Sequence, residues 1–264
     1  MAKKEIKFVQ AQLNARGLDA GPEDGILGQR TLDALNRVEG IPAQWSKTRK
    51  AVAFIQMLAK ENGIETGDVD GYWGPQTSFA FGALWRVLID GSEPEIWRPE
   101  DLADENPNRW PKQTPQENLF RFYGEVGENQ ASVDLPYPLK LAWKKTTVVN
   151  RFQCHEKVQD SLQRVLSRVL NHYGTKEIKR LRLDLWGGCL YVRKMRGGTK
   201  YSTHSWGIAV DFDPERNQLE WGRDRAHFAH PDYDMWWSLW EEEGWISLGR
   251  HRNFDWMHIQ AAKL

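Results

Sequence analysis

Apolar positions in the first 90 residues recur at intervals of three and four. This is the period of an α-helix, and it places each apolar set on one face of its helix. Asp-Gly dipeptides, which favour turns with positive φ, lie between the sets. We therefore expect residues 1–90 to form an all-α domain. The apolar sets are Ile6, Val9 and Leu13; Leu32, Leu35 and Val38; Ala51, Phe54, Ile55 and Leu58; and Phe81, Leu84 and Leu88.

The same pattern occurs twice within this domain, at an offset of 46 residues. Each copy predicts a helix, a glycine-rich loop and a second helix. The glycines are expected mainly to shape the loop between two packed helices. The matching pairs are Val9-Gln10 with Ile55-Gln56, Gly17-Leu18 with Gly63-Ile64, Gly21 with Gly67, Asp24-Gly25 with Asp70-Gly71, Gly28 with Gly74, and Thr31 with Thr77.

Helical and alternating patterns follow one another in the C-terminal half. An apolar stripe with helical spacing ends at Gly174, and shorter runs alternate between apolar and polar residues as strands do. In one of these runs Val210 would face one side of a sheet and Asp211 the other. The order predicts an α+β domain over residues 116–264. The expected elements are helices over 156–173 and near 233–243, and strands over 178–185, 190–193, 207–212 and 256–260.

Residues 91–115 connect the two predicted domains. They are rich in proline and acidic side chains, and proline blocks long helices and central strands. We expect this stretch to be a semi-rigid linker. Residues 116–147 are assigned to the second domain as irregular surface structure, because the apolar run 135–139 does not suit a free linker.

Composition and charge exclude several classes of protein. The chain has 36 basic and 36 acidic side chains, and this zero net charge argues against a nucleic-acid partner. No apolar run is long enough for an integral membrane segment, and from the charged first residues we expect no secretory signal. Cys154 and Cys189 are expected to be core residues, with one disulfide as the alternative. Most of the fourteen Trp are expected in the core, and nothing demands more than a monomer.

Four polar residues of the C-terminal domain stand among apolar neighbours. Asp211 lies in the middle of a predicted strand, with His204 seven residues before it. Near the C-terminus, His258 lies within the last predicted strand, and Asp255 directly precedes that strand. A buried carboxylate must be paired or bind a metal. Two histidines and one carboxylate with an open position are the ligands of a catalytic zinc site, and a further carboxylate suits a general base.

The N-terminal motif resembles the helical peptidoglycan-binding repeat of bacterial cell-wall hydrolases. The resemblance implies that this domain binds cell-wall glycopeptide, so that bacterial peptidoglycan is the expected partner. Tyr72 and Trp73 are the candidate contacts, as exposed aromatic residues. The two copies of the motif are Gln10-x-x-Leu13 followed by Asp24-Gly25-Ile26-Leu27-Gly28-x-x-Thr31, and Asp70-Gly71-Tyr72-Trp73-Gly74-Pro75-Gln76-Thr77.

The C-terminal motif resembles the zinc D-Ala-D-Ala carboxypeptidase and L-alanyl-D-glutamate endopeptidase family, in particular its phage endolysin branch. The motif is Ser202-x-His204-x-x-Gly207-x-Ala209-x-Asp211 followed by Asp255-x-x-His258. The resemblance implies one Zn²⁺ per chain, held by His204, Asp211 and His258.

The same resemblance implies roles for residues around the zinc. Asp255 would be the general base, and Ser202 would orient the loop of the first ligand. Arg193 would stabilise the developing oxyanion or hold a substrate carboxylate. Arg196 is the alternative for that role, and strand alternation favours Arg193.

Asp255 stands where the carboxypeptidase and dipeptidase branches have Glu, which favours the endopeptidase branch. The expected function is that of an endolysin cleaving an amide of the stem peptide, with L-Ala–D-Glu as the preferred bond. Such a protein would wait in the host cytoplasm until the membrane is opened. The alternatives are a D-Ala-D-Ala carboxypeptidase or cross-link endopeptidase with the same zinc site, and a non-catalytic wall-binding protein.

Overall fold

The computed structural model describes residues 1–64, 66, 68–92, 105–195 and 198–264, which form two compact units. One unit consists mainly of residues 1–95 and the other of residues 96–195 and 200–264. Each unit has its own hydrophobic core. The described part of the chain contains no helix that is long and apolar enough to cross a membrane.

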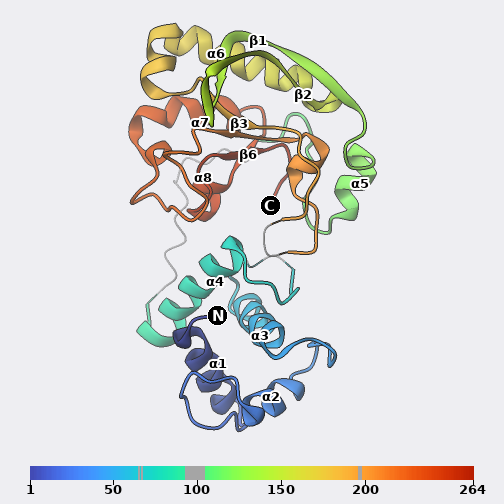
Figure 1. The fold of residues 1–264 in the computed structure, drawn as a ribbon, viewed down its shortest axis with the longest axis vertical. Coiled ribbons are helices and arrows are strands. Elements are labelled where there is room, and N and C mark those ends of the chain that lie inside the picture. Colours follow the sequence, from blue (N-terminus) through green and yellow to red (C-terminus); the bar gives the residue numbers. More distant parts are fainter. Residues whose placement is uncertain (65, 67, 93–104, 196–197) are drawn as a thin grey trace. The chain divides into compact units, whose positions relative to one another are not determined.

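The N-terminal unit is helical, as the sequence predicts (Figure 1, blue to cyan). Its core contains most of the predicted apolar residues, among them Leu35 and Phe54, together with Phe8, which was not predicted. The helices are α1 (Lys3–Ala15), α2 (Gln29–Asn36), α3 (Lys47–Glu61), α4 (Pro75–Trp85) and a π-helical turn (Arg86–Asp90).

A buried glutamine organises each copy of the repeat. The Gln10 side chain donates to Asp24 Oδ1 at 3.0 Å and to Thr31 Oγ1 at 3.2 Å, and it accepts from the Gly25 N–H at 2.9 Å. In the second copy Gln56 makes the same bonds to Asp70, Thr77 and Gly71, at 2.9, 3.0 and 2.8 Å. These bonds explain the repeated residue types as a scaffold for the loop.

The repeated Asp-Gly turns also need glycine for steric reasons. Gly71 has φ +70°, and a Cβ atom there would lie 2.6 Å from the Arg49 carbonyl oxygen. Gly25 meets Lys3 in the same way, with φ +78° and 2.9 Å to the Lys3 carbonyl oxygen. Both turns therefore press against the start of the preceding long helix, where no side chain fits.

The C-terminal unit is an α+β fold around a mixed six-stranded sheet with the order β2-β1-β3-β4-β6-β5. Strands β1 and β3 are parallel, and the other neighbours are antiparallel. Its elements are α5 (Glu117–Tyr123), β1 (Gln130–Leu141), β2 (Lys144–His155), α6 (Glu156–Leu181), β3 (Leu185–Gly188), a 3₁₀ turn (Thr203–Trp206), β4 (Ala209–Phe212), two short 3₁₀ turns (His227–Ala229 and Pro231–Tyr233), α7 (Asp234–Glu241), β5 (Ile246–Ser247), α8 (Leu248–Arg252) and β6 (His258–Gln260).

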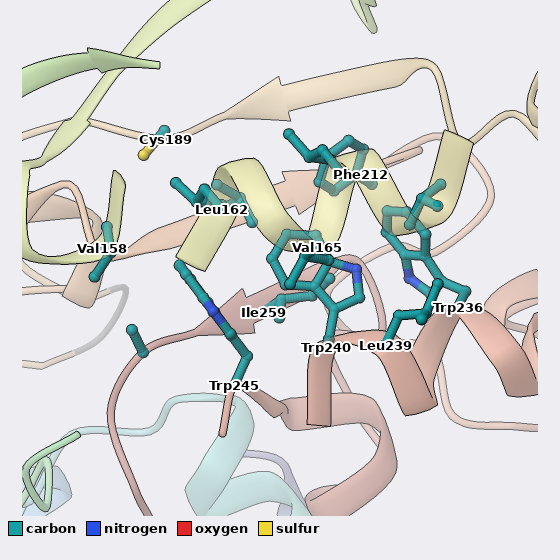
Figure 2. Packing of buried hydrophobic residues seen from close by; sticks show 14 of the residues in the cluster. Val158, Leu162, Val165, Cys189, Phe212, Trp236, Leu239, Trp240, Trp245 and Ile259 are labelled. Carbon is teal, nitrogen blue, oxygen red and sulfur yellow. The ribbon is translucent and has the colours of Figure 1, made fainter. Parts of the chain in front are cut away.

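The core of this unit lies between α6 and the sheet and continues into a tryptophan cluster. Figure 2 shows Val158, Leu162 and Val165 of α6 beside Phe212 and Ile259 of the sheet. The prediction that most tryptophans are core residues is confirmed for six that are fully buried. They are Trp206, Trp236, Trp237, Trp240, Trp245 and Trp256. The two cysteines are free and buried, as expected for core residues.

Three expectations for this unit are wrong. Residues 178–181 belong to α6, which continues past a kink at Gly174 (φ 64°), because Ile178 and Leu181 also fit helical spacing. Residues 190–193 are not a strand, since β3 already ends at Gly188. The region 116–147 is not irregular, because it contains α5, β1 and the start of β2.

The prolines that suggested irregular structure are accommodated within β1. The pairing of β1 with β2 shifts register between Asp134 and Leu139, where Pro136 and Pro138 lie. A bulge frees these positions from donating ladder hydrogen bonds, which proline cannot do. Of the predicted linker, residues 93–104 lie outside the described residues, and Trp110 further along is buried in the core of the C-terminal unit.

Candidate metal centre

Three polar residues of the C-terminal unit converge on one point. Asp211 lies in β4 and pairs in register with His258, the first residue of β6. His204 lies in the 3₁₀ turn that precedes β4. Val210 and Phe212, on either side of Asp211, point into the core, so strand alternation turns the carboxylate to the opposite face. The sequence therefore places the three side chains together through sheet pairing.

The facing atoms of these residues have the spacing of metal ligands. His204 Nε2 lies 3.2 Å from His258 Nδ1 and 3.2 Å from Asp211 Oδ1, and His258 Nδ1 lies 3.1 Å from Asp211 Oδ1. A tetrahedral zinc ion with bonds of roughly 2.0–2.1 Å has ligand atoms separated by about 3.3 Å. His204, Asp211 and His258 thus form a group that can hold a metal ion.

The other nitrogen of each histidine is held by a protein oxygen. His204 Nδ1 lies 2.7 Å from the carbonyl oxygen of Cys189, and His258 Nε2 lies 3.1 Å from Gln260 Oε1. A carbonyl oxygen can only accept, so each histidine donates its N–H there and turns its lone pair toward the centre. Three acceptor atoms then face one another, and a cation satisfies all three.

The charges of the site shift the pKa values of its members. Burial raises the pKa of Asp211, but the neighbouring His204 and His258 outweigh this and hold the pKa well below its usual range. Burial lowers the pKa of His258, but its contact with the Asp211 carboxylate outweighs this and raises it. The carboxylate is therefore the charged anchor of the group.

Asp255 is a buried carboxyl group at the edge of this group. Burial raises its pKa to about 7, and the charge of Asp211 acts in the same direction, while His258, His204 and Arg193 oppose it. Its Oδ1 atom is buried and has no hydrogen-bond partner in the described part of the chain. A buried polar atom without a partner is costly, and at an active site it suits a bound reactant.

The backbone around Asp255 holds it in an unusual conformation. Asp255 has φ 54°, its N–H donates to the Leu219 carbonyl at 3.0 Å, and its carbonyl accepts from the His258 N–H at 3.0 Å. A positive φ is uncommon for a residue other than glycine, although Asp tolerates it better than most. The turn therefore fixes Asp255 relative to the first residue of β6.

The predicted arginine and serine lie in the same loop region. Arg193 is half-buried and acts electrostatically on Asp255. Ser202 is buried and donates its N–H to the Arg193 carbonyl at 3.0 Å. The roles given to both from the resemblance stay predictions, and Arg196 lies outside the described residues.

The two candidate wall contacts lie in the N-terminal unit and differ from each other. Tyr72 is 36% exposed, and the Arg49 guanidinium lies 4.5 Å from the centre of its ring. Trp73 is only half-buried rather than exposed as expected, because its ring packs 5.7 Å from that of Phe81. Tyr72 is thus the more accessible of the pair.

Sequence reasoning missed the residues that hold Arg193 and the two histidine ligands in place. Ser205 accepts from the Arg193 N–H at 3.0 Å and donates to the Arg193 carbonyl at 2.8 Å. Gln260 and the carbonyl of Cys189 fix the two histidines. Gln260, two residues after His258, gave a weak signal, since it is a polar residue at the end of an apolar strand.

No protein-family model, curated protein or solved structure matches this chain.

Proposed function

We propose that the chain is a zinc-dependent peptidoglycan hydrolase of the endolysin type. The observation that carries this is the convergence of His204, Asp211 and His258 at 3.1–3.2 Å. Beside them Asp255 has a buried carboxyl oxygen without a hydrogen-bond partner among the described residues. The residues fit Zn²⁺, because two neutral imidazoles and one carboxylate leave a fourth position open. The resemblance to cell-wall zinc peptidases supports the substrate class.

The metal ligands, Asp255 and Arg193 have different roles in the proposed amide hydrolysis. His204, Asp211 and His258 would hold a Zn²⁺ ion, which would supply Lewis-acid polarisation of the scissile carbonyl and a lowered pKa of water. Asp255 takes the proton of the attacking water at its Oδ1 atom and passes it to the leaving amine, as its raised pKa near neutrality suits. Arg193 carries the positive charge that holds a carboxylate of the substrate or stabilises the developing oxyanion.

The N-terminal unit would bring this chemistry to its substrate. A wall-binding unit linked to a hydrolase raises the local concentration of cleavable bonds without any new contact at the active site. We assign wall binding to the repeat unit, with Tyr72 as its leading contact. The protein would act as a monomer, stay in the host cytoplasm until the membrane is opened, and cleave the L-Ala–D-Glu bond.

The test is mass spectrometry of the soluble products from purified peptidoglycan sacculi, with and without a zinc chelator. We expect chelator-sensitive release of stem peptides that begin at D-Glu, with L-Ala left on muramic acid. Release of D-Ala alone would instead make the protein a carboxypeptidase. Bound sacculi without any products would overturn the enzymatic proposal in favour of a wall-binding protein.

A further inference from the structure

Gln260 is a fully engaged amide beside the metal centre. Its Oε1 atom lies 3.1 Å from His258 Nε2 and accepts from Thr203 Oγ1 at 3.3 Å. Its Nε2 atom donates to Gln113 Oε1 at 2.8 Å and to the Ala262 carbonyl at 2.9 Å. Gln260 is 1% exposed, so these contacts rather than water satisfy the amide.

The contacts of Gln260 determine which nitrogen of His258 is free. The Ala262 carbonyl can only accept, so the NH₂ group of Gln260 must face it and the oxygen must face His258. His258 therefore donates from Nε2, and its Nδ1 lone pair faces Asp211 and His204. The Ala262 carbonyl, just after β6, thus determines the tautomer of His258 by orienting the Gln260 amide.

Gln113 reaches this network from a distant part of the sequence. Its N–H donates to the Lys263 carbonyl at 2.7 Å, and the Lys263 N–H donates to the Pro111 carbonyl at 2.9 Å. Residues 111–113 thus run alongside the C-terminal end of the chain. Nearby Trp110 is buried and donates its indole N–H to the Glu243 carbonyl at 3.1 Å. The segment is anchored independently of the metal centre.

We propose that Gln260 and Gln113 are positioning residues that hold His258 in the tautomer that binds metal. Gln113 restrains Gln260, Gln260 restrains the His258 ring, and the segment 111–113 thereby contributes to metal affinity. The inference rests on the metal site of the proposed function and does not depend on which bond the protein cleaves.

The alternative is that the two glutamines form an ordinary buried polar pair that only stabilises the edge of the fold. The two possibilities differ in what they change. A stabilising pair affects the melting temperature of the metal-free protein, whereas a positioning pair affects zinc affinity and the tautomer of His258. The test therefore measures all three.

The experiment compares Gln260→Leu, Gln113→Leu and Gln113→Glu with the full-length protein. The dissociation constant for Zn²⁺ is measured by competition with a chromophoric chelator. We expect Gln260→Leu to weaken zinc binding by roughly 10–100-fold, as removal of such partners does. Gln113→Leu should weaken zinc binding less, since the Ala262 carbonyl still accepts from the Gln260 amide. Gln113→Glu should keep the zinc affinity of the unmodified protein, because it retains the oxygen that accepts from Gln260.

Gln116→Leu is the matched control. Gln116 is a buried glutamine just after the segment 111–113, and its amide bonds to the backbone of Tyr201, at 2.8 and 3.0 Å. The Gln116→Leu variant should have a zinc dissociation constant within about twofold of that of the unmodified protein, since the partners of Gln116 are not metal ligands. Thermal unfolding of each zinc-free variant reports any loss of folding separately.

Long-range ¹H–¹⁵N NMR of the histidine rings supplies the second measurement. In the zinc-free protein we expect His258 to protonate at Nε2, and in Gln260→Leu to lose this preference. Unchanged zinc affinity and unchanged ring signals in folded Gln260→Leu and Gln113→Leu would overturn the proposal. Failure of the unmodified protein to bind zinc would instead overturn the proposed metal site, while zinc binding without wall cleavage would overturn the proposed activity alone.

Discussion

The chemistry of the metal centre depends on which nitrogen of each histidine carries the proton. The carbonyl of Cys189 decides this for His204, and Gln260 decides it for His258. Both acceptors, the Cys189 carbonyl and the Gln260 side-chain oxygen, lie outside the sequence motif that contains the ligands. Residue types and spacing therefore predicted the three ligands, but the atoms that face the metal became visible only in the folded chain.

Asp255→Asn should abolish hydrolysis without removing the metal. Asparagine has the same shape but cannot take a proton from water, and loss of a general base costs about 10²–10⁴-fold in rate. Turnover on purified sacculi, with zinc content measured on the same samples, checks this. Asp160→Asn, on the exposed surface of α6, is the control and should keep full activity. Undiminished turnover by Asp255→Asn would remove Asp255 from the mechanism.

Among the elements, the buried glutamines of the repeat explain why the copies share their loop residues. Gln56→Leu should destabilise the N-terminal unit by about 2–3 kcal/mol, because it leaves the Gly71 N–H without its acceptor and removes the hydrogen bonds to Asp70 and Thr77. Chemical denaturation followed by circular dichroism measures the change. Gln29→Leu, on the surface of α2, should shift stability by less than about 0.5 kcal/mol. Equal shifts for the two variants would contradict a special role of Gln56.

The Glu243 carboxylate fixes helix α6 to the segment between α7 and β5. Glu243 accepts from Arg164 Nη2 at 2.7 Å, from Ser161 Oγ at 2.9 Å and from Asn108 Nδ2 at 3.0 Å. Burial raises the pKa of Glu243, but these hydrogen bonds outweigh it and lower the pKa from 4.5 to about 2. The charged form is thus favoured in the folded protein.

The contribution of Glu243 to stability should therefore depend on pH. Because its folded-state pKa lies below the unfolded value, the contribution is complete above pH 4.5 and is lost as the pH falls toward 2. A shift of this size corresponds to about 3 kcal/mol, and we expect about 2 kcal/mol because Arg164 is half exposed. The difference in unfolding free energy between the protein and Glu243→Gln should shrink over this range. A constant difference would refute the assignment.

At the level of elements, the sequence predicted the helices whose apolar residues recur with helical spacing over a long stretch. The helices of the N-terminal unit and the first part of α6 follow from apolar spacing alone. It failed for the β1–β2 hairpin, because Pro136 and Pro138 argue against a strand unless a bulge accommodates them. It also failed after Gly174, where a few alternating leucines fit a helix as well as a strand.

For the whole molecule, two separate cores imply two units that unfold on their own. Zinc should raise the unfolding transition of the C-terminal unit only, by about 2.7 kcal/mol at a free concentration 100 times its dissociation constant. Differential scanning calorimetry with zinc and with chelator tests this. His258→Ala should remove the zinc response and leave the other transition unchanged. A zinc response of both transitions would mean that the metal site is not confined to the C-terminal unit.

The domain order and the class of each unit were also predictable, since the two halves differ in hydrophobic period. The place of residues 106–113 was not, because a proline-rich acidic stretch has the composition of a linker. Trp110 nevertheless packs in the core of the C-terminal unit. The composition of the whole stretch suggested a linker, but the packing of one side chain, Trp110, fixes residues around it to the C-terminal unit.

The in-register pairing of Asp211 with His258 has a kinetic consequence. These two ligands are separated by 46 intervening residues, and they come together only when β4 and β6 pair in one alignment. A slip of one residue would turn the carboxylate or the imidazole to the opposite face of the sheet. Non-local strand pairing forms late during folding. Metal binding by all three ligands therefore requires that β4 and β6 have already paired in register.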